Sequence, residues 1–317
     1  MIFKLSFVLV GFFQLVHVVD RRLETLDGDV VLLRIIPQRG MHRLLGQKVA
    51  VVSPKPQTTR TKIMGVLTED EVQLVFTDTP GFHRPRTKLG EKMIKAVSDS
   101  ISGVDACLFV VEPSGELRDA EKDLLKKFKD EKMPVILAIN KIDSVKQKEL
   151  LIERMAQFSA LYDFEAIVPC SALKGDGFGD LKDELFKQAQ PSPHFFPDDT
   201  LTDQPERVLA AEIIREKLLN LLDDEVPHGV AVCIERMHER EDSNITDIDA
   251  TIYCERESHK GIIIGKKGEM LKKVSTKARE DMERFFMCKI NLHCWVKVKE
   301  GWRNREGLIH NFGLDNE

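Results

Sequence analysis

The residues K-G-I-I-I-G-K-K-G-E at positions 260–269 decide how the last third of this chain folds. An isoleucine triplet ends at Gly265, and the amphipathic residues 270–286 follow Gly268 with helical periodicity. Glycine lacks a Cβ, so a backbone bounded by two glycines can approach phosphates closely, and the two lysines between them add positive charge. The stretch predicts a tight loop between two helices that clamps about four nucleotides of RNA.

The elements expected around this loop form an α+β unit. Their predicted order is helix 208–222, strand 230–238, strand 248–255, a short helix, the loop, helix 269–286 and strand 289–298. This order is that of the prokaryotic-type KH domain, whereas a bare G-x-x-G without these neighbours is most often a turn. The RNA-binding candidates are the loop and the lysines near it: Gly265, Lys266, Lys267, Gly268, Lys260, Lys272 and Lys273.

The charge distribution favours the same interpretation. Residues 255–305 hold 14 Lys or Arg against 7 Asp or Glu, a net charge of +7. The whole chain of 317 residues has a formal net charge of -5, so the remainder carries -12. A local excess of positive charge attracts phosphate backbones through counterion release. Trp295, in the last predicted strand, is expected to be a core residue rather than a platform for stacked bases.

The first half of the chain has a different pattern, in which short apolar runs alternate with amphipathic stretches. The predicted strands are 72–77, 106–112, 135–139 and 166–170, and the predicted helices are 88–102, 118–129 and 147–160. This alternation predicts an α/β domain with a parallel sheet and helices on both faces. Ligands of such sheets bind at the carboxyl ends of the strands.

Two polar motifs in this half suit Mg²⁺ and phosphate. The strand at 72–77 runs directly into the sequence Asp78, Thr79, Pro80, Gly81. A carboxylate there can hold Mg²⁺, largely through water, and the glycine amide can donate to a γ-phosphate. Upstream, Thr58 and Thr59 suit a mobile loop that closes a hydroxyl onto the metal, although a turn rich in Ser and Thr is the alternative.

Two further motifs suit a guanine base. The strand at 135–139 ends in Asn140, Lys141, Ile142 and Asp143, and the strand at 166–170 is followed by Ser171, Ala172 and Leu173. The Asp143 carboxylate can accept both the N1 proton and the exocyclic amine of guanine, whereas adenine has no matching pair of donors. The Lys141 stem can pack on the base, and the Ala172 amide can meet the guanine O6. The motifs begin 62 and 31 residues apart, each directly after a predicted strand, which makes coincidence a poor explanation.

Together, residues 44–60, D-T-P-G-F-H, N-K-I-D and C-S-A resemble the Era family of bacterial GTPases, over residues 44–313. The resemblance implies an α/β Ras-like P-loop GTPase domain, with an atypical N-terminal part, followed by an α+β prokaryotic-type KH domain. It implies GTP and Mg²⁺ as cofactors, and the 3′ end of small-subunit ribosomal RNA and the 30S subunit as partners. The expected activity is hydrolysis of GTP, and the expected role is small-subunit assembly.

The expected domain division is a non-matching segment at 1–43, the GTPase domain at 44–190, a proline-rich linker at 191–207 and the KH domain at 208–317. No catalytic residue can be assigned. Phe82 follows the D-T-P-G run where many GTPases place a glutamine that orients water, so any hydrolysis is expected to be slow without stimulation.

The phosphate-binding loop of such a family, G-x-x-x-x-G-K-S, is absent from this sequence. Three explanations remain open. In the first, residues 1–43 are a frameshifted or wrongly started translation of an ordinary family member. In the second, the chain is an RNA-binding pseudo-GTPase that has lost nucleotide binding. In the third, an unrecognised segment binds phosphate. Each leaves the RNA-binding prediction unchanged.

The remaining features concern the cellular setting. Six scattered cysteines form no C-x-x-C pair, which fits a reducing cytoplasm. The apolar residues 5–19 lack a small-residue cleavage site and are too short to span a bilayer, so export is not expected. A cytoplasmic monomer is expected. The family resemblance adds peripheral association with the cytoplasmic face of the inner membrane, which these residues do not themselves support.

Overall fold

The computed structural model describes most of the chain after residue 62. The described residues are 9–10, 13–16, 29–33, 43–46, 60, 63–78, 87–99, 106–117, 119–223, 225–241 and 243–314. They fall into two compact units. The first unit comprises 1–49, 61–84 and 93–203, and the second comprises 50–60, 85–92 and 204–317.

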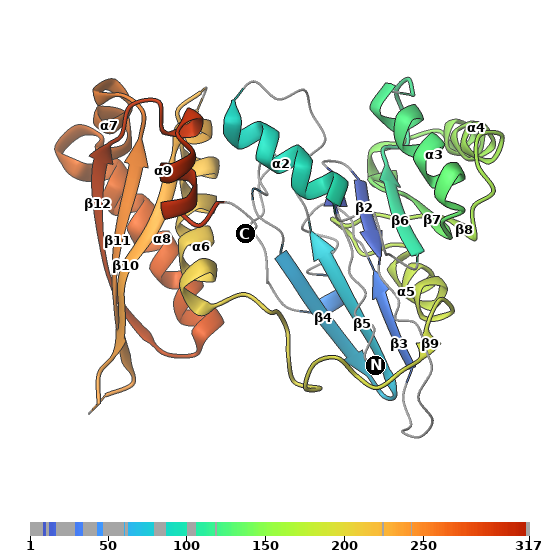
Figure 1. Cartoon of the computed structure of the whole chain (residues 1–317), viewed down its shortest axis with the longest axis horizontal. Coiled ribbons are helices and arrows are strands. Elements are labelled where there is room, and N and C mark those ends of the chain that lie inside the picture. Colours follow the sequence, from blue (N-terminus) through green and yellow to red (C-terminus); the bar gives the residue numbers. More distant parts are fainter. Residues whose placement is uncertain are drawn as a thin grey trace. The chain divides into compact units, whose positions relative to one another are not determined.

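The first unit is built on a mixed sheet, to which nine strands of the described residues belong (Figure 1). They are β1 (Leu9–Val10), β2 (Phe13–Val16), β3 (Asp29–Leu33), β4 (Ile63–Glu69), β5 (Val72–Asp78), β6 (Ala106–Val111), β7 (Val135–Ile139), β8 (Ala166–Pro169) and β9 (Gln190–Pro191). The order across the sheet is β8-β7-β6-β2-β5-β3-β9, with β1 paired to β2 and β4 paired to β5.

Three helices lie close to the predicted ones, namely α2 (Lys88–Asp99), α3 (Asp119–Glu131) and α4 (Lys148–Ser159). A fourth helix, α5 (Phe178–Phe186), was not predicted. Every residue of β6 and β7 is buried, so both faces of the sheet are covered there. Phe109 on β6 packs edge-on against Phe128 and Phe158, with ring centroids 6.1 and 5.8 Å away. These aromatic contacts fix α3 and α4 to β6.

The prediction of a purely parallel sheet is wrong in its first half. Strands β6, β7 and β8 are parallel neighbours, but β4 forms an antiparallel hairpin with β5, and β2 runs antiparallel to both β5 and β6. The hairpin is closed by Asp70 and Glu71, and Asp70 has a positive φ of 52°, which Asp tolerates better than most residues. Neither strand β4 nor this hairpin was predicted from the sequence.

The proline-rich residues after 190 pack on the β4–β5 hairpin. The buried Gln73 side chain accepts hydrogen bonds from the backbone N–H groups of Phe195 and Phe196, at 2.9 and 3.0 Å. Thr202 forms an isolated bridge with Gly65. The first unit therefore extends to Asp203.

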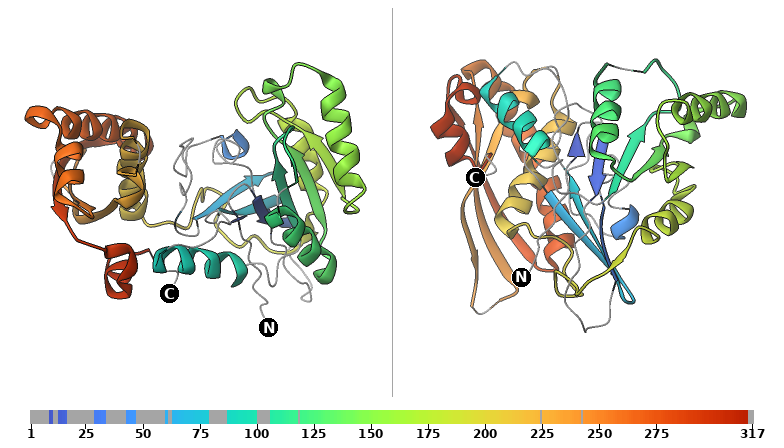
Figure 2. Two further views of the ribbon diagram at one scale, coloured as in Figure 1. Left: turned by 90° about the horizontal axis from the view of Figure 1, so that it is seen from above. Right: turned by 45° about the vertical axis from the view of Figure 1, so that its right-hand side comes forward.

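The second unit is α+β, as predicted. Its elements are α6 (Glu206–Leu221), β10 (Ala231–Glu239), β11 (Ile245–Cys254), α7 (Glu257–Ile264), α8 (Glu269–Phe286), β12 (Lys289–Val298) and α9 (Glu306–Asn311). The sheet has the order β10-β11-β12, with β10 antiparallel and β12 parallel to β11. Helices α6 and α8 pack together and against this sheet, as the views in Figure 2 show.

One continuous apolar core holds this unit together. Fully buried side chains come from each layer, with Ile214 and Leu218 on α6, Ile252 on β11, and Val274 and Met282 on α8. Residues of β12 at even positions face this core, and those at odd positions face away. Helix α8 is therefore amphipathic: one face packs on this core, and the opposite face is open to solvent.

Candidate functional site

The guanine-binding candidates lie at one edge of the first unit's sheet. Strands β5 and β6 are both antiparallel to β2, so they point the same way, and β7 and β8 are parallel to β6. Asp78 is the last residue of β5, Asn140 follows β7, and Ser171 comes two residues after β8. The fold therefore brings the carboxyl ends of these strands to the same edge.

Part of the predicted site lies outside the described residues. This applies to Thr58, Thr59, Thr79, Pro80 and Gly81, and for Asp78 only the backbone is described. In the part of the chain that the structure describes, no three His, Cys, Asp or Glu side chains gather in a way that could hold a metal ion. The Mg²⁺ ligands suggested by the sequence therefore remain predictions.

Asn140 joins the two guanine-reading loops. Its side chain is only 4% exposed, and its Oδ1 accepts hydrogen bonds from the backbone N–H of Lys141 at 2.8 Å and of Ala172 at 2.9 Å. The second bond spans the two motifs and sets their separation. The Ala172 N–H, which was predicted to meet the guanine O6, donates to Asn140 in this structure.

A second bridge connects Asp143 to Ser171. The Ser171 hydroxyl donates a hydrogen bond to the Asp143 carboxylate. The Oγ of Ser171 also accepts a hydrogen bond from the Lys174 N–H at 3.1 Å. Ser171 is fully buried, whereas Asp143 is exposed. The carboxylate is thus held at one oxygen and oriented before any base arrives, which favours a ligand with paired N–H donors.

Lys141 is held in an unusual backbone conformation. Its φ is 68°, and its Nζ lies 2.5 Å from the Glu112 carboxylate, just after β6. This ion pair between half-exposed side chains holds the aliphatic stem in place over the same edge. Glu112 was not among the residues predicted from the sequence, although it directly follows a buried strand, as the other candidates do.

The loop after β8 depends on glycine. Gly177 has a φ of 71°, and a Cβ there would lie 2.2 Å from the Pro169 carbonyl oxygen. The turn is closed by the Ser171 N–H, which donates to the Asp176 carbonyl at 2.9 Å. Leu173 is 59% exposed, and its carbonyl accepts a hydrogen bond from Arg43 at 3.1 Å. Burial raises the pKa of the Cys170 thiol at the base of this loop to about 12, so it remains neutral.

The glycine-lysine loop of the second unit forms a tight turn between α7 and α8, as its sequence predicts. Gly265 has a φ of 73°, and an added Cβ would lie 2.7 Å from the Cβ of Met270. Gly268 and Lys267 also have positive φ, at 80° and 51°. The side chains of Lys266 and Lys267 are exposed. The loop therefore presents two cations on a backbone that a larger residue than glycine would disturb.

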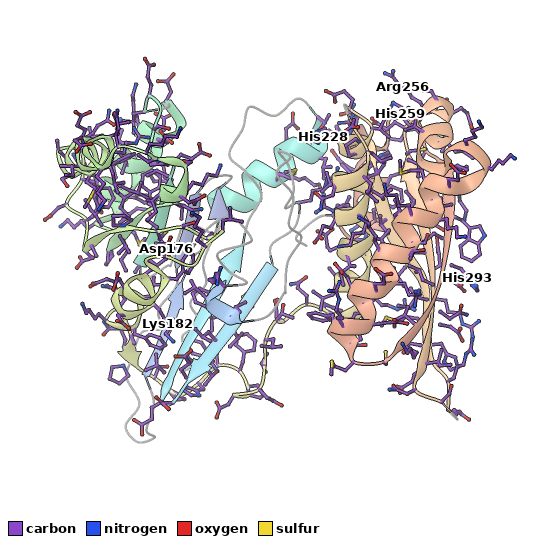
Figure 3. The ribbon with its side chains drawn as sticks, turned by 180° about the vertical axis from the view of Figure 1, so that it is seen from behind. Asp176, Lys182, His228, Arg256, His259 and His293 are labelled. Atoms are coloured by element: carbon purple, nitrogen blue, oxygen red, sulfur yellow. The ribbon has the colours of Figure 1, made fainter. Side chains whose placement is uncertain are left out.

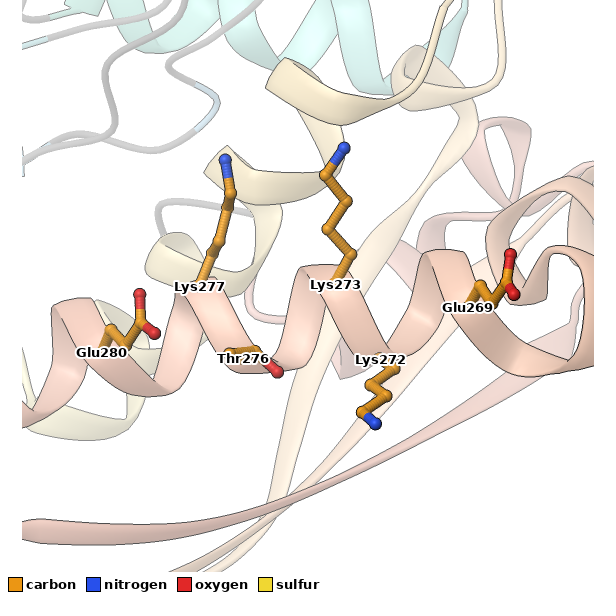
Figure 4. Close-up of a pocket in the computed structure, with 6 residues that line it drawn as sticks. All are labelled: Glu269, Lys272, Lys273, Thr276, Lys277 and Glu280. Carbon is orange, nitrogen blue, oxygen red and sulfur yellow. The ribbon is translucent and has the colours of Figure 1, made fainter.

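A basic surface continues from this loop along α8. Lys272, Lys273 and Lys277 are exposed and line a depression of about 390 Å³, with Glu269 and Glu280 at its ends. Figure 4 shows Lys273 and Lys277 pointing the same way from the helix, and Lys272 pointing the other way. Lys277 was not among the predicted RNA-binding residues, although it lies four residues after Lys273 and hence on the same face of the helix.

Other cations of the same helix are already paired. Arg279 lies 2.9 Å from Glu283, and Arg284 forms an ion pair with Asp281. Among the described residues, no ion pair involves the three lysines that line the depression. Lys260, on α7, lies 3.8 Å from Glu257. The unpaired lysines are therefore the cations best able to meet an external phosphate.

The prediction that Trp295 is a core residue is wrong. Its side chain is 48% exposed, because odd positions of β12 face away from the helices. The other tryptophan, Trp302, is fully buried, and its indole N–H donates to the Gly229 carbonyl at 2.9 Å. The sequence placed both residues near lysines and arginines but could not tell which face of the last strand each would take.

Family models match both units. A model described as KH domain matches residues 225–303, and one described as 50S ribosome-binding GTPase matches residues 41–141. In the described residues, no helix is both long and apolar enough to cross a membrane.

Relatives with known names match nearly the whole chain. The GTPase Era of Clostridioides difficile is 48% identical over 277 residues, which are 87% of this chain and 93% of that protein. The GTPase Era of Ruminiclostridium cellulolyticum is 49% identical over 273 residues, covering 86% of this chain and 91% of the relative. The prediction of family from the sequence is therefore confirmed.

Two solved structures agree with this. A variant of Aquifex aeolicus Era bound to GDP and AlF4⁻ matches with a TM-score of 0.84 and 35% identity, covering 88% of this chain and 95% of that chain. Era in complex with MgGDPNP and nucleotides 1506–1542 of 16S ribosomal RNA matches with the same TM-score and identity, covering 88% and 94%. The predicted fold, a Ras-like GTPase domain followed by a KH domain, is confirmed.

Proposed function

Because this chain belongs to the Era family of GTPases, we propose that it binds guanine nucleotide and small-subunit ribosomal RNA and acts in assembly of the 30S subunit. The observation that carries this proposal is the pair of preformed sites. One is the base-reading edge held by Asn140 and Ser171, and the other is the Gly265–Gly268 loop. They correspond to the predicted GTPase domain at 44–190 and the KH domain at 208–317.

The base-reading edge supports a guanine nucleotide as its ligand. Asp143 is exposed and oriented by Ser171, and Lys141 is fixed by Glu112, so the carboxylate and the lysine stem are in place for one planar base. In this proposal Asp143 accepts from guanine N1 and the exocyclic amine, and the Ser171, Ala172 and Leu173 segment lies at the O6 side. The bound GTP supplies the γ-phosphate whose presence or loss distinguishes two states of the protein.

The metal and phosphate ligands come from the family resemblance. Mg²⁺ is assigned to Thr58, Thr59 and Asp78, and the γ-phosphate to the Thr79, Pro80 and Gly81 segment. The carboxylate of Asp78 and the hydroxyls of the two threonines have the oxygen chemistry that Mg²⁺ prefers. No lysine-serine phosphate loop occurs in the sequence, so the affinity for GTP rests on fewer ligands than in a typical member.

Nucleotide binding is tested with a fluorescent GTP analogue and the purified full-length chain. Mg²⁺-dependent binding at micromolar or tighter affinity is expected, and Asp143→Asn should exchange the preference from GTP to xanthosine triphosphate, because an amide matches the second carbonyl of xanthine. Absence of binding to either nucleotide, together with intact RNA binding, would establish a nucleotide-independent RNA-binding protein and overturn the switching half of the proposal.

RNA binding is tested with the segment of 16S ribosomal RNA that the related complex contains, nucleotides 1506–1542. Lys266→Ala with Lys267→Ala should weaken binding at low salt and flatten its dependence on salt concentration, since each lost phosphate contact removes a released counterion. An unchanged salt dependence would show that these lysines do not touch phosphate. The proposed working state is a cytoplasmic monomer, with peripheral membrane contact as a family expectation; sedimentation with and without lipid vesicles tests both.

A further inference from the structure

Trp295 is an exposed aromatic side chain on an edge strand. It is 48% exposed, at the centre of a run of outward-facing residues on β12. Single apolar side chains are often exposed on protein surfaces, but a tryptophan at such a position marks an interaction site more often than a leucine does. The described residues of the second unit leave the outer surface of this ring uncovered.

The ring has an aromatic neighbour on the same face. His293 lies two residues earlier on β12, its side chain is 58% exposed, and its ring centroid is 6.0 Å from that of Trp295 with an interplanar angle of 66°. Figure 3 shows His293 projecting outward from the strand. Cys294, between the two, packs toward the core instead. The two rings thus form one exposed aromatic surface, which we call the β12 aromatic pair.

The charges around the pair suit a polyanion. β12 contains no acidic residue, and the exposed Lys297 and Lys299 follow Trp295 at the next two outward positions. Among the described residues, neither of these lysines forms an ion pair, while Lys289 at the start of the strand lies 3.6 Å from Glu283. A row of aromatic rings flanked by unpaired cations is typical of surfaces that bind single-stranded nucleic acid.

The nearest carboxylates on this face are already engaged. Asp249 on β11 lies 3.3 Å from His293, and Asp247 accepts hydrogen bonds from Arg240 at 2.8 and 2.6 Å and from Asn291 at 2.7 Å. The Arg240 guanidinium compensates the charge of Asp247, so this carboxylate adds little repulsion toward a phosphate backbone.

The strand is also next to the expected RNA clamp. β12 pairs with β11 on one side only, so it is the edge of the three-stranded sheet. Helix α7 starts three residues after β11 ends, and it leads directly into the Gly265–Gly268 loop. Both parallel strands point toward that end of the sheet. A single strand of RNA that leaves the clamp and crosses the sheet edge reaches the outward face of β12.

We propose that the β12 aromatic pair is a second RNA contact, in which Trp295 and His293 stack on unpaired bases and Lys297 and Lys299 meet the adjacent phosphates. This contact lies on the face of the sheet opposite to α6 and α8 and is distinct from the basic depression on α8. It rests on the proposed RNA-binding function and extends it from about four clamped nucleotides to a longer single strand.

Tryptophan fluorescence provides a direct test. The chain has two tryptophans, and Trp302 is fully buried, so a change in emission on adding RNA reports on Trp295. With the 16S segment of nucleotides 1506–1542 as the probe, we expect quenching in the wild-type chain and a 5- to 100-fold loss of affinity in Trp295→Ala, roughly the range of base–aromatic stacking. Trp295→Phe keeps a ring and should retain most of the affinity. Unchanged Trp302 emission in both variants verifies folding.

The outcomes separate this contact from the proposed function. Loss of binding in the Lys266→Ala, Lys267→Ala variant, with wild-type affinity in Trp295→Ala and no quenching, would overturn the aromatic contact and leave the RNA-binding function intact. No binding of this RNA by the wild-type chain would overturn both. If Trp295→Ala binds the RNA normally but no longer co-sediments with 30S subunits, the ring is a protein-docking surface and the stacking proposal is wrong.

Discussion

The guanidinium of Arg60 lies 5.7 Å from the centre of the Trp302 ring, although 242 positions separate the two residues in the sequence. Arg60 is 2% exposed, and its two terminal nitrogens donate to the carbonyls of Val230 at 2.5 Å and His228 at 2.8 Å. Burial, followed by the charge of Arg215, lowers its pKa to about 9, so it stays charged at neutral pH. A residue directly after the predicted Thr58–Thr59 loop is therefore part of the second unit.

Replacing Arg60 should destabilise the second unit. Arg60→Met removes the N–H donors of two hydrogen bonds to backbone carbonyl oxygens. We expect the free energy of unfolding to fall by about 2 kcal/mol, the cost of leaving such acceptors unsatisfied. Urea unfolding followed by tryptophan emission measures this, since Trp302 is a direct neighbour. Arg207→Met, at an exposed position on α6, is the matched control and should change stability by less than about 0.5 kcal/mol.

Removing the Asn140 side chain should separate the two base-reading loops. In Asn140→Ala, the Ala172 N–H loses its acceptor, and we expect a loss of about 1–3 kcal/mol in unfolding free energy. Hydrogen exchange at the Ala172 amide is the sharper readout and should become much faster. The Lys174 amide, which donates to Ser171, provides the internal control, and equal acceleration at both amides would contradict a local role for Asn140.

Gly177 and Gly179 provide a matched pair of substitutions, because both follow closely after the turn that Ser171 and Asp176 close. Gly177→Ala places a Cβ against the Pro169 carbonyl at a positive φ, and we expect a loss of more than about 2 kcal/mol. Gly179→Ala, inside α5 with no atom within 4 Å of the new Cβ, should be neutral or stabilise the helix by up to about 1 kcal/mol. Thermal unfolding of both variants tests the difference, and similar losses would show that the turn is not constrained by Pro169.

Lys277 should contribute to the salt dependence of RNA binding. Lys277→Ala is expected to reduce the slope of log affinity against log salt by about 0.7, the value for one phosphate contact on a single strand. Arg279→Ala, on the same helix but paired with Glu283, should reduce it less. Binding titrations at several salt concentrations measure both slopes. A larger effect of Arg279 would place the RNA on a different face of α8.

The buried thiol of Cys170 should make the first unit sensitive to alkali. Its pKa of about 12 lies above the ordinary value of 9.0 because burial disfavours the thiolate. The unfolded chain therefore releases this proton first, so the stabilising contribution is complete below pH 9 and is lost as the pH rises toward 12. Cys170→Ala should show a shallower decline of unfolding free energy across that interval, by up to about 1.4 kcal/mol per pH unit. Identical slopes in the two proteins would contradict this assignment.

The order of elements and most site residues could be predicted because they depend on local patterns. Strands β5, β6, β7 and β8 and helices α2, α3 and α4 follow from apolar runs and helical periodicity, whereas α5 was not predicted. The polar residues directly after these strands lie at one edge of the sheet, because the strands point the same way. Strand β4 was missed because its sequence, I-M-G-V-L-T-E, contains a glycine and shows no clear alternation. Its partner β5 stabilises it instead, which is a tertiary effect.

The sequence alone determined that Gly265 to Gly268 form a loop containing two lysines and that Asp143 follows an apolar strand, because backbone freedom, charge and period are properties of neighbouring residues. Only the tertiary structure decided that Trp302 is buried under Arg60 while Trp295 faces solvent. The same holds for Asn140 and Ser171, whose hydrogen bonds tie two motifs into one site. These outcomes depend on which face of a strand meets the core and on contacts between residues far apart in the chain, and neither is written in any local pattern.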